Sequence, residues 1–559
     1  MRVIDESGPI NRRWPRSIGP YGSPGGKETY FRMLVDSRIE GIVAHNLYRF
    51  YLYAVFTAMA IFAAVGLGQL LQTLLALTPL RGLDSAAPSS ANIVQSVVFA
   101  GVAWIIAALL GGLHYWLIRR DMQNDPAAAG SSIRAFFLNV VELIATPLAV
   151  GISAYAVIMQ LGNVYAGNLN FPTAFSIAIL SLAAFFEWER RRMQASSGTA
   201  LVFQRLHLYG VQLILLVLLS FAWYSTVSSL VGAFAYRNPA LCGGFTVCHG
   251  TNLLSAVAGT LWITLFWVGY GFFSRRDTSS LLRQILHFAS FAYGVGSLLV
   301  GIYHGLELLL LMLVFKVSIA PGDIVGSYDF VSPLSFGLVV VGVYSIWLRF
   351  SARQRPEGPV TIALTAEAIA TALLAGVFWW GLGNVLNNTI ETVFPASAVP
   401  LSRDWASVIA FVIAGLAYIP LDLFLRQRNI QDSATAAGPR RGFVFAMIGA
   451  GALAGAIGGA AALYALLTSL LGSPLSNWQQ VAHAGLSAFV IGVIVAGIYL
   501  FIANREQLFS SFVRPQGPGL TPTVKPVTIE DVLDTLLAGK ITRDEAAARI
   551  RDIMSSHLE

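Results

Sequence analysis

Hydrophobic residues run through this chain in long stretches, broken by short polar segments that carry most of the charge. Twelve of these stretches approach or exceed the roughly 20 residues that an α-helix needs to cross a bilayer. We predict spans at about residues 49–78, 93–118, 135–160, 171–188, 205–234, 253–273, 284–315, 330–349, 360–394, 405–425, 442–471 and 481–503. The predicted fold is therefore all-α, a polytopic helical membrane protein.

Arginine follows every second predicted span, and this spacing groups the spans into six hairpins. The second helices of these hairpins end in sequences such as Y-W-L-I-R-R, E-W-E-R-R-R and F-F-S-R-R. The loops after even-numbered spans hold 17 Lys and Arg residues, whereas the loops after odd-numbered spans hold four. By the positive-inside rule, both termini should lie in the cytoplasm, with the chain in a bacterial inner membrane.

Longer repeats predict two pseudo-repeated six-helix halves, residues 47–275 and 281–503. The first and fifth spans open with R-F-Y-L-Y-A-V and R-L-H-L-Y-G-V, starting at Arg49 and Arg205. The third and ninth spans share the frame E-x-I-A-T, 225 positions apart. Internal repeats of this kind are common in transporters, and they also occur in membrane scaffolds.

Two polar tails flank the predicted membrane part. Residues 1–46 should form a cytoplasmic tail that ends in an interfacial helix. Residues 504–559 read as a proline-rich linker followed by two short capped helices, with one-sided apolar residues between 528 and 554. A hairpin this small is expected to dock, so we predict that it binds the membrane domain, a second copy or a cytoplasmic protein partner.

Composition supports the membrane class and removes one alternative. The chain is 56% hydrophobic and 12% charged, whereas soluble domains are about 25% charged. The net charge of +7 could indicate nucleic-acid binding. Because the basic residues fall on alternate loops, membrane topology explains them, and we expect the lipid bilayer rather than a nucleic acid as partner.

The two cysteines, Cys242 and Cys248, lie between the fifth and sixth spans on the predicted outer side. Two cysteines close together outside the cytoplasm predict a disulfide. A metal site that includes His249 is the alternative, but it lacks a fourth ligand nearby, so we expect no metal.

Two glutamates are the candidates for intramembrane chemistry. Glu142 and Glu367 occupy the shared E-x-I-A-T frame, about seven residues inside their spans. A carboxylate at that depth must be protonated, paired or exposed to water. The repeat predicts that the two face each other or a shared cavity, with His114 and Tyr344 as the nearest partners. The alternative is that the glutamates only hold helices together.

Three further patterns were assigned to packing or pairing. Glycines at every fourth position, at residues 451, 455 and 459, predict close helix contacts rather than a dinucleotide loop. Asp422 stands four residues before Arg426, which predicts an ion pair within one helix. Histidines within the spans are treated as packing residues rather than haem ligands, so we expect no cofactor.

No sequence motif points to an enzyme, because H-E-x-x-H, G-x-S-x-G and Walker A patterns are all absent. The R-x-x-L-Y openings and arginine-closed hairpins resemble a domain-of-unknown-function family of bacterial multi-span membrane proteins. That resemblance implies a membrane location and supplies no catalytic residues. The C-terminal L-L-A-G-K-I-T-x-x-E-A segment resembles short two-helix oligomerisation modules.

Three classes of function stay open from the sequence. The first is a permease or an ion- or proton-coupled transporter with a polar site between two halves. The second is a membrane scaffold, assembly or signalling protein without transport. The third, which the residues support least, is a haem or quinone redox protein.

Overall fold

The structure of the chain is a computed structural model, and it describes most of the predicted membrane part. The described residues are 24–81, 87–161, 169–193, 198–235, 253–274, 281–319, 324, 327–352, 358–394, 401–431, 433–471 and 477–508. The predicted disulfide between Cys242 and Cys248 and the predicted hairpin within residues 528–554 lie outside these residues.

Within the described residues the fold is all-helical, as predicted, and contains no strand. The α-helices are α1 (Pro24–Leu75), α2 (Ser90–Ile106), α3 (Gly112–Asn124), α4 (Ser132–Leu161), α5 (Asn170–Arg191), α6 (Gly198–Ala235), α7 (Leu253–Ser274), α8 (Leu281–Leu313), α10 (Val331–Ala352), α11 (Gly358–Val393), α12 (Leu401–Gly415), α13 (Tyr418–Gln431), α14 (Ser433–Leu470) and α15 (Trp478–Arg505). Short helical turns are η1 (Pro79–Arg81), the π-helical η2 (Ala107–Gly111) and η3 (Pro126–Gly130).

Twelve of the described helical segments are long and apolar enough to cross a membrane, and each matches one predicted span. The second span is continuous from α2 through η2 to α3. The tenth joins α12 and α13 across a break that precedes Pro420. Proline cannot donate the backbone hydrogen bond that a helix interior requires, which explains a break at this place.

The helices form two compact units, residues 1–363 and 364–559. The predicted division into halves of six spans stays a prediction.

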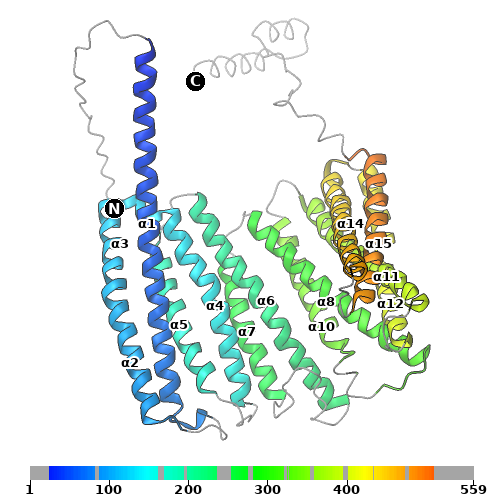
Figure 1. Cartoon of the computed structure of the whole chain (residues 1–559), viewed down its shortest axis with the longest axis horizontal. Coiled ribbons are helices and arrows are strands. Elements are labelled where there is room, and N and C mark those ends of the chain that lie inside the picture. Colours follow the sequence, from blue (N-terminus) through cyan, green and yellow to red (C-terminus); the bar gives the residue numbers. More distant parts are fainter. Residues whose placement is uncertain are drawn as a thin grey trace, which may run out of the picture. The chain divides into compact units, whose positions relative to one another are not determined.

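In unit 1, four hairpins stack side by side (Figure 1). Each first helix packs on its own second helix and on the second helix of the next hairpin. Thus α1 contacts α5, α4 contacts α7, and α6 contacts α10. This regular stagger makes the hairpin the packing unit, in the manner of a repeat protein whose units contact their neighbours.

The same register recurs at the start of each first helix in unit 1. An arginine lies near the start of each first membrane span, and the residue four positions later, one turn further on the same face, is buried. These buried residues are Tyr53, Leu138, Tyr209 and His287, which follow Arg49, Arg134, Arg205 and Arg283. The hairpin, and not only the larger half, therefore carries a repeated pattern.

We call the end where first helices begin and second helices end the basic end. Buried ion pairs close two hairpins of unit 1 there. Arg49 bonds Asp121 at 2.8 Å and Asp125 at 2.5 Å. Arg134, only 3% exposed, lies 3.2 Å from Glu189. In both cases the arginine lies near the start of the first membrane span, and the acid lies at or just after the end of the second helix.

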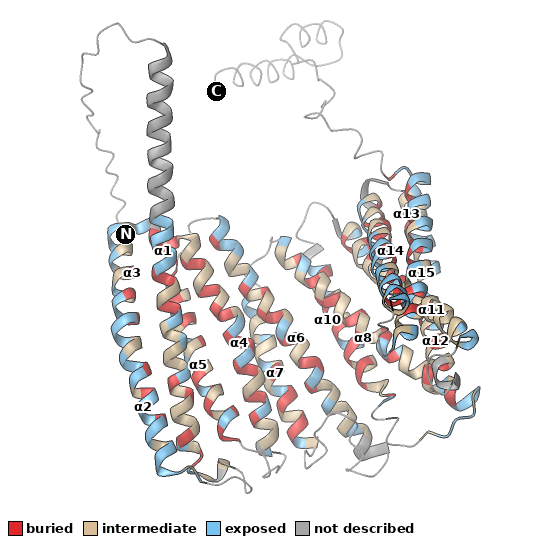
Figure 2. Cartoon of the chain, viewed as in Figure 1, coloured by how far each residue is buried: buried red, intermediate tan, exposed pale blue. Residues whose placement is uncertain are grey.

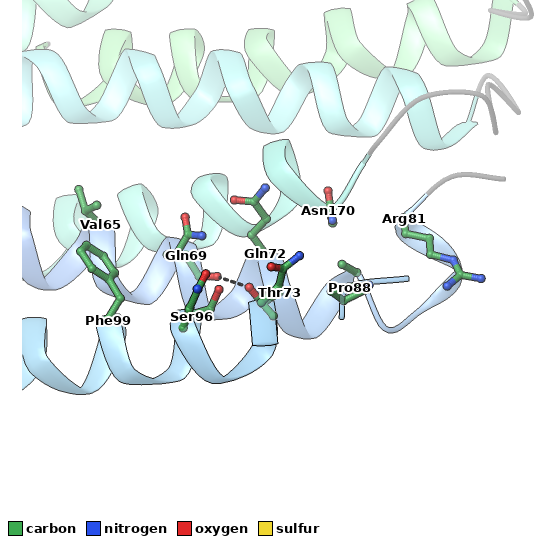
Figure 3. Close-up of a pocket in the computed structure, with 12 residues that line it drawn as sticks. Val65, Gln69, Gln72, Thr73, Arg81, Pro88, Ser96, Phe99 and Asn170 are labelled. Carbon is green, nitrogen blue, oxygen red and sulfur yellow. Dashed lines mark hydrogen bonds between the residues drawn. The ribbon is translucent and has the colours of Figure 1, made fainter. Parts of the chain in front are cut away.

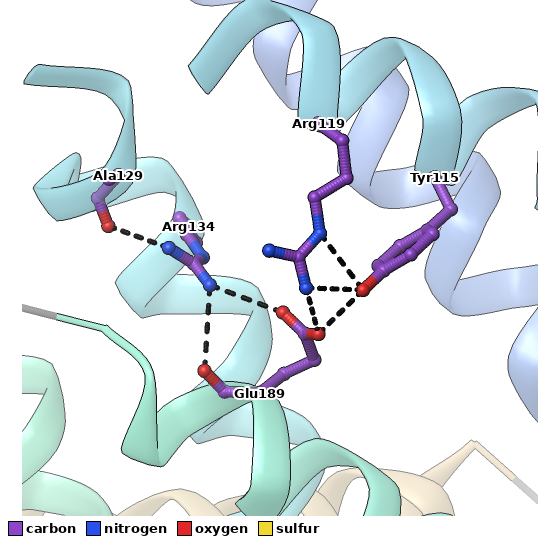
Figure 4. A network of polar contacts seen from close by, with 5 residues as sticks. All are labelled: Tyr115, Arg119, Ala129, Arg134 and Glu189. Carbon is purple, nitrogen blue, oxygen red and sulfur yellow. Dashed lines mark hydrogen bonds and ion pairs between the residues drawn. The ribbon is translucent and has the colours of Figure 1, made fainter. Parts of the chain in front are cut away.

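Glu189 also joins this hairpin to the preceding one (Figure 4). Its other carboxylate oxygen accepts a hydrogen bond from Tyr115 at 2.7 Å and pairs with Arg119 at 2.6 Å. Arg134 is held in turn by the carbonyl of Ala129 at 2.9 Å. One buried carboxylate thus pairs with two arginines and links two hairpins.

Unit 2 repeats this arrangement with the charges reversed. Arg440, 1% exposed, bonds Glu506 of its own hairpin at 2.9 and 3.0 Å and also pairs with Asp422 of the preceding hairpin. The predicted pair of Asp422 with Arg426 is wrong, because Arg426 lies 3.6 Å from Glu506 instead. Arg440 is the most buried residue of this group, and its guanidinium pairs with both carboxylates.

Close glycine contacts join α14 to α15, as the spacing by four predicted. A Cβ atom on Gly492 would lie 2.3 Å from the backbone nitrogen of Gly455, and one on Gly451 would lie 2.7 Å from that of Ala496. Only residues without side chains permit so short a separation. Helices α11 and α12 meet similarly where Gly415 faces the backbone of Phe378.

The outward surfaces of the helices are apolar, as lipid contact requires. Figure 2 shows that exposed and intermediate residues alternate with buried ones along most helices. Fully exposed aliphatic and aromatic side chains include Leu109, Phe221, Leu261, Leu265 and Phe501, each more than 60% accessible. The protein is therefore an integral, multi-pass membrane protein.

Candidate intramembrane site

Glu142 lies in the middle of unit 1 and is 1% exposed. It belongs to α4, whose apolar sequence continues on both sides of it, and Pro147 follows five residues later. Because proline has no N–H group, the carbonyl of Leu143 loses its usual helical partner beside the carboxylate. The helix therefore presents both a carboxyl group and a released carbonyl in this turn.

Three side chains approach the Glu142 carboxyl group from α4, α6 and α7. The hydroxyl of Thr146 donates to its Oε2 at 3.0 Å. The Nε2 of His207 lies 3.7 Å from the same oxygen. Tyr270 donates to the Thr146 hydroxyl at 3.4 Å and packs edge-on against the His207 ring. We call Glu142, Thr146, His207 and Tyr270 the Glu142 cluster.

A glycine lies where α6 packs against α4 beside this cluster. Gly210 stands one turn after His207, and a Cβ atom there would lie 2.6 Å from the side chain of Leu143. A larger residue would require the Leu143 side chain to move at the level of the carboxyl group.

The cluster leaves polar atoms without hydrogen bonds. Among the described residues, Oε1 of Glu142 and both ring nitrogens of His207 lack a hydrogen-bond partner. The His207 side chain is completely buried. Buried polar groups are almost always hydrogen-bonded, so unpaired ones call for an explanation such as function or bound water.

Charged groups of α5 lie on the basic-end side of the cluster. Glu187 pairs with Arg190 and Arg191 at 2.6 and 2.7 Å. The Glu187–Arg190 pair is within electrostatic range of Glu142. Arg191 is 67% exposed, so this ion-pair group reaches the surface.

Glu367, the repeat equivalent of Glu142, lies in unit 2 and is half-buried on α11. The threonine of the shared frame makes a hydrogen bond four residues back in both helices. Thr146 donates to the side chain of Glu142, whereas Thr371 donates to the backbone carbonyl of Glu367 at 2.7 Å. The predicted meeting of the two glutamates stays a prediction.

The other two predicted site residues have partners of their own. His114 bonds the carbonyl of Leu110, within the π-helical turn, at 2.7 Å and lies 3.4 Å from the Tyr51 hydroxyl. Tyr344 is 1% exposed and packs against His287. The contacts described for Glu142 come from neither of them.

His207 is the residue that the sequence interpretation missed. It was treated as a packing residue near a span end. The signal was present in the repeat, because the aligned openings place His207 opposite Tyr51. In the structure each of these two residues meets a polar partner from another helix, Glu142 and His114 respectively.

Comparison with protein-family models, with curated proteins and with solved structures found no match for this chain. The resemblance to a bacterial multi-span family therefore stays a prediction, and the site must be interpreted from its own geometry.

Proposed function

We propose that this protein is a proton-coupled membrane transporter in which Glu142 and His207 exchange the coupling proton. The observation that carries the proposal is a buried carboxyl group 3.7 Å from a buried imidazole, with unpaired polar atoms on both. Ionisable residues inside a membrane are costly, and they commonly mark ion pathways or proton relays.

The pair can move a proton without changing the net charge of the site. A neutral carboxylic acid that gives its proton to a neutral imidazole becomes a carboxylate beside an imidazolium. For direct transfer, Oε2 of Glu142 and Nε2 of His207 would need to come closer by less than about 1 Å, to hydrogen-bond distance. Alternatively, one water molecule would bridge the two atoms. Rotation of the Glu142 side chain away from Thr146 would supply such a movement.

A proton suits this site better than a metal cation. Calcium takes six to eight oxygen ligands, and magnesium requires nearly octahedral oxygen coordination. The Glu142 cluster offers one carboxyl group, two hydroxyls and an imidazole, and the imidazole would repel a cation once protonated. The neighbouring Glu187–Arg190 pair supplies a charged route towards the basic end.

The experiment uses the full chain in liposomes that contain a pH-sensitive dye. A pH gradient is applied with or without an extract of small polar metabolites, which supplies candidate co-substrates. We expect proton entry that depends on the extract. Glu142→Gln should reduce it tenfold or more, because a positioned acid–base group typically contributes about 10²–10⁴ in rate. His207→Gln should reduce it as well.

Glu391→Gln is the matched control, since it removes a half-buried acid from α11 in unit 2. Glu367→Gln tests the predicted second carboxylate. If Glu142→Gln and His207→Gln fold normally and leave proton entry equal to that of the Glu391 control, the proposal is wrong.

A membrane scaffold is the second candidate, and one observation favours it. The hairpins of unit 1 stack in a row, and Glu189 links two of them through buried ion pairs. Such a row provides a rigid platform and requires no moving part. A scaffold would show no extract-dependent proton entry in any variant, so the same experiment separates the two functions.

A further inference from the structure

A second polar site lies at the other end of unit 1, away from the basic end. It is a cavity of about 610 Å³ between the last turns of α1 and the first turns of α2, bordered by the start of α5. Figure 3 shows Val65 and Phe99 at one end of it and Arg81 at the other. Its volume falls within the range of about 300–1,000 Å³ found for small-molecule sites.

Side-chain amides dominate the lining. Gln69 and Gln72 come from α1, and Asn92 and Gln95 come from α2. All four lie inside segments that are otherwise apolar enough to span a membrane. None of the four side chains has a hydrogen bond with the described residues. The four amides therefore offer several hydrogen-bond donors and acceptors to a ligand in one cavity.

The remaining lining restricts the charge of the ligand. Among the residues that the structure describes, no carboxylate lines the cavity, so none of them attracts a cation. Arg81 is the one basic residue of this described lining, and it already takes part in a polar interaction of its own. The hydroxyls of Thr73 and Ser96 add further neutral polar groups.

We propose that this amide-lined cavity binds a neutral ligand with several hydroxyl groups, of the sugar type. Each carboxamide offers an acceptor oxygen and donor N–H groups side by side, which matches hydroxyls that both donate and accept. Phe99, 40% exposed, adds an apolar face at one end. A sugar ring has the same combination of polar edges and apolar faces.

The ligand can be a soluble sugar or the headgroup of a lipid. A lipid can reach the cavity because α2, which borders it, also carries exposed apolar residues such as Val98 and Ile105. The test uses the full-length protein in phosphatidylcholine nanodiscs and saturation-transfer NMR. The probes are maltose, glycerol 3-phosphate and choline. We expect transfer to maltose, and little transfer to the anion or the cation.

Variants locate the binding. Gln95→Leu alters an exposed side chain and should leave the fold intact, while Gln69→Leu and Gln72→Leu remove amides of α1. Each should weaken maltose binding roughly fivefold to tenfold, the effect of losing one or two neutral hydrogen bonds. Gln479→Leu is the control, because Gln479 is exposed at the start of α15 in unit 2.

Adding a monoglucosyl lipid to the nanodiscs identifies the source. Displacement of maltose by this lipid at low content indicates a headgroup, and lack of displacement indicates a soluble sugar; both support the site. Absence of maltose binding would overturn the proposal. So would binding that Gln95→Leu and Gln479→Leu affect equally, or transfer to glycerol 3-phosphate alone.

Discussion

At the scale of single residues, the protein accommodates buried acids in two ways. Glu189 is paired with two arginines and a tyrosine, so its charge is fully compensated. Glu142 has only neutral hydroxyl and imidazole neighbours within contact distance. A fully paired carboxylate holds helices together, whereas a buried carboxyl group without a fixed counter-charge has no ion pair to break when it gains a proton.

The paired acid should matter for stability. Glu189→Gln leaves the guanidinium of Arg134, 3% exposed, without a counter-charge. Loss of one member of a buried pair typically costs about 3–5 kcal/mol. Unfolding in mixed micelles with increasing SDS measures this effect.

Glu187→Gln provides the comparison in the same helix. Its partners Arg190 and Arg191 are 18% and 67% exposed, and its carboxylate is 26% exposed. An ion pair of this kind contributes no more than about 1 kcal/mol. Equal losses for the Glu189 and Glu187 variants would show that the buried network has no special role in stability.

The sequence could locate Glu142 but not its partner. A glutamate in an otherwise apolar stretch can be recognised from the sequence alone, and its recurrence in the repeat drew further attention to it. The approach of His207 depends on how α4 and α6 pack, and Gly210 lies against Leu143 in this contact. Glu142 and His207 are 65 positions apart, and local residue spacing does not predict a contact over that separation.

At the scale of helices, small residues determine which pairs pack most closely. The spacing of Gly451, Gly455 and Gly459 was sufficient to predict a tight contact, because glycines at every fourth position share one helix face. The partner surface on α15, with Gly485 and Gly492, could not be assigned in advance. Any of the apolar helices could have supplied it.

Gly492→Ala should destabilise unit 2. The added Cβ atom would lie 2.3 Å from the backbone of Gly455 and 2.6 Å from that of Gly451, and neither backbone group can rotate away. Overpacking of this type typically costs about 1–3 kcal/mol. The measurement is again SDS-induced unfolding.

Gly497→Ala is the matched change in the same helix. Nothing lies within 4 Å of a Cβ atom at Gly497. Alanine favours the helix over glycine by roughly 0.5–1 kcal/mol, so this variant should be neutral or slightly more stable. Equal destabilisation by the two substitutions would mean that α14 and α15 do not pack through Gly492.

At the scale of the whole molecule, the twelve spans were predictable because length and hydrophobicity determine which segments cross a bilayer. The stagger of hairpins in unit 1 was not, since lipid-facing and buried positions are both apolar in a membrane helix. The pairing of Arg440 with Asp422 could not be predicted either. An arginine at the end of a span indicates the topology but does not indicate which acid it pairs with.

The two functional proposals also belong to this scale, because they lie at opposite ends of unit 1. The Glu142 cluster lies towards the basic end, and the amide-lined cavity lies at the other. They rest on different residues and can fail independently.

The central claim is that Glu142 exchanges its proton with water while it stays buried in the membrane part. Infrared difference spectroscopy of the full protein in lipid, recorded between acid and alkaline pH, measures this directly. We expect a protonated-carboxyl band that titrates, shifts on transfer to D₂O, disappears in Glu142→Gln and persists in Glu391→Gln. A Glu142 band that stays unchanged at every pH and in D₂O would contradict the account, because a permanently protonated side chain only joins helices.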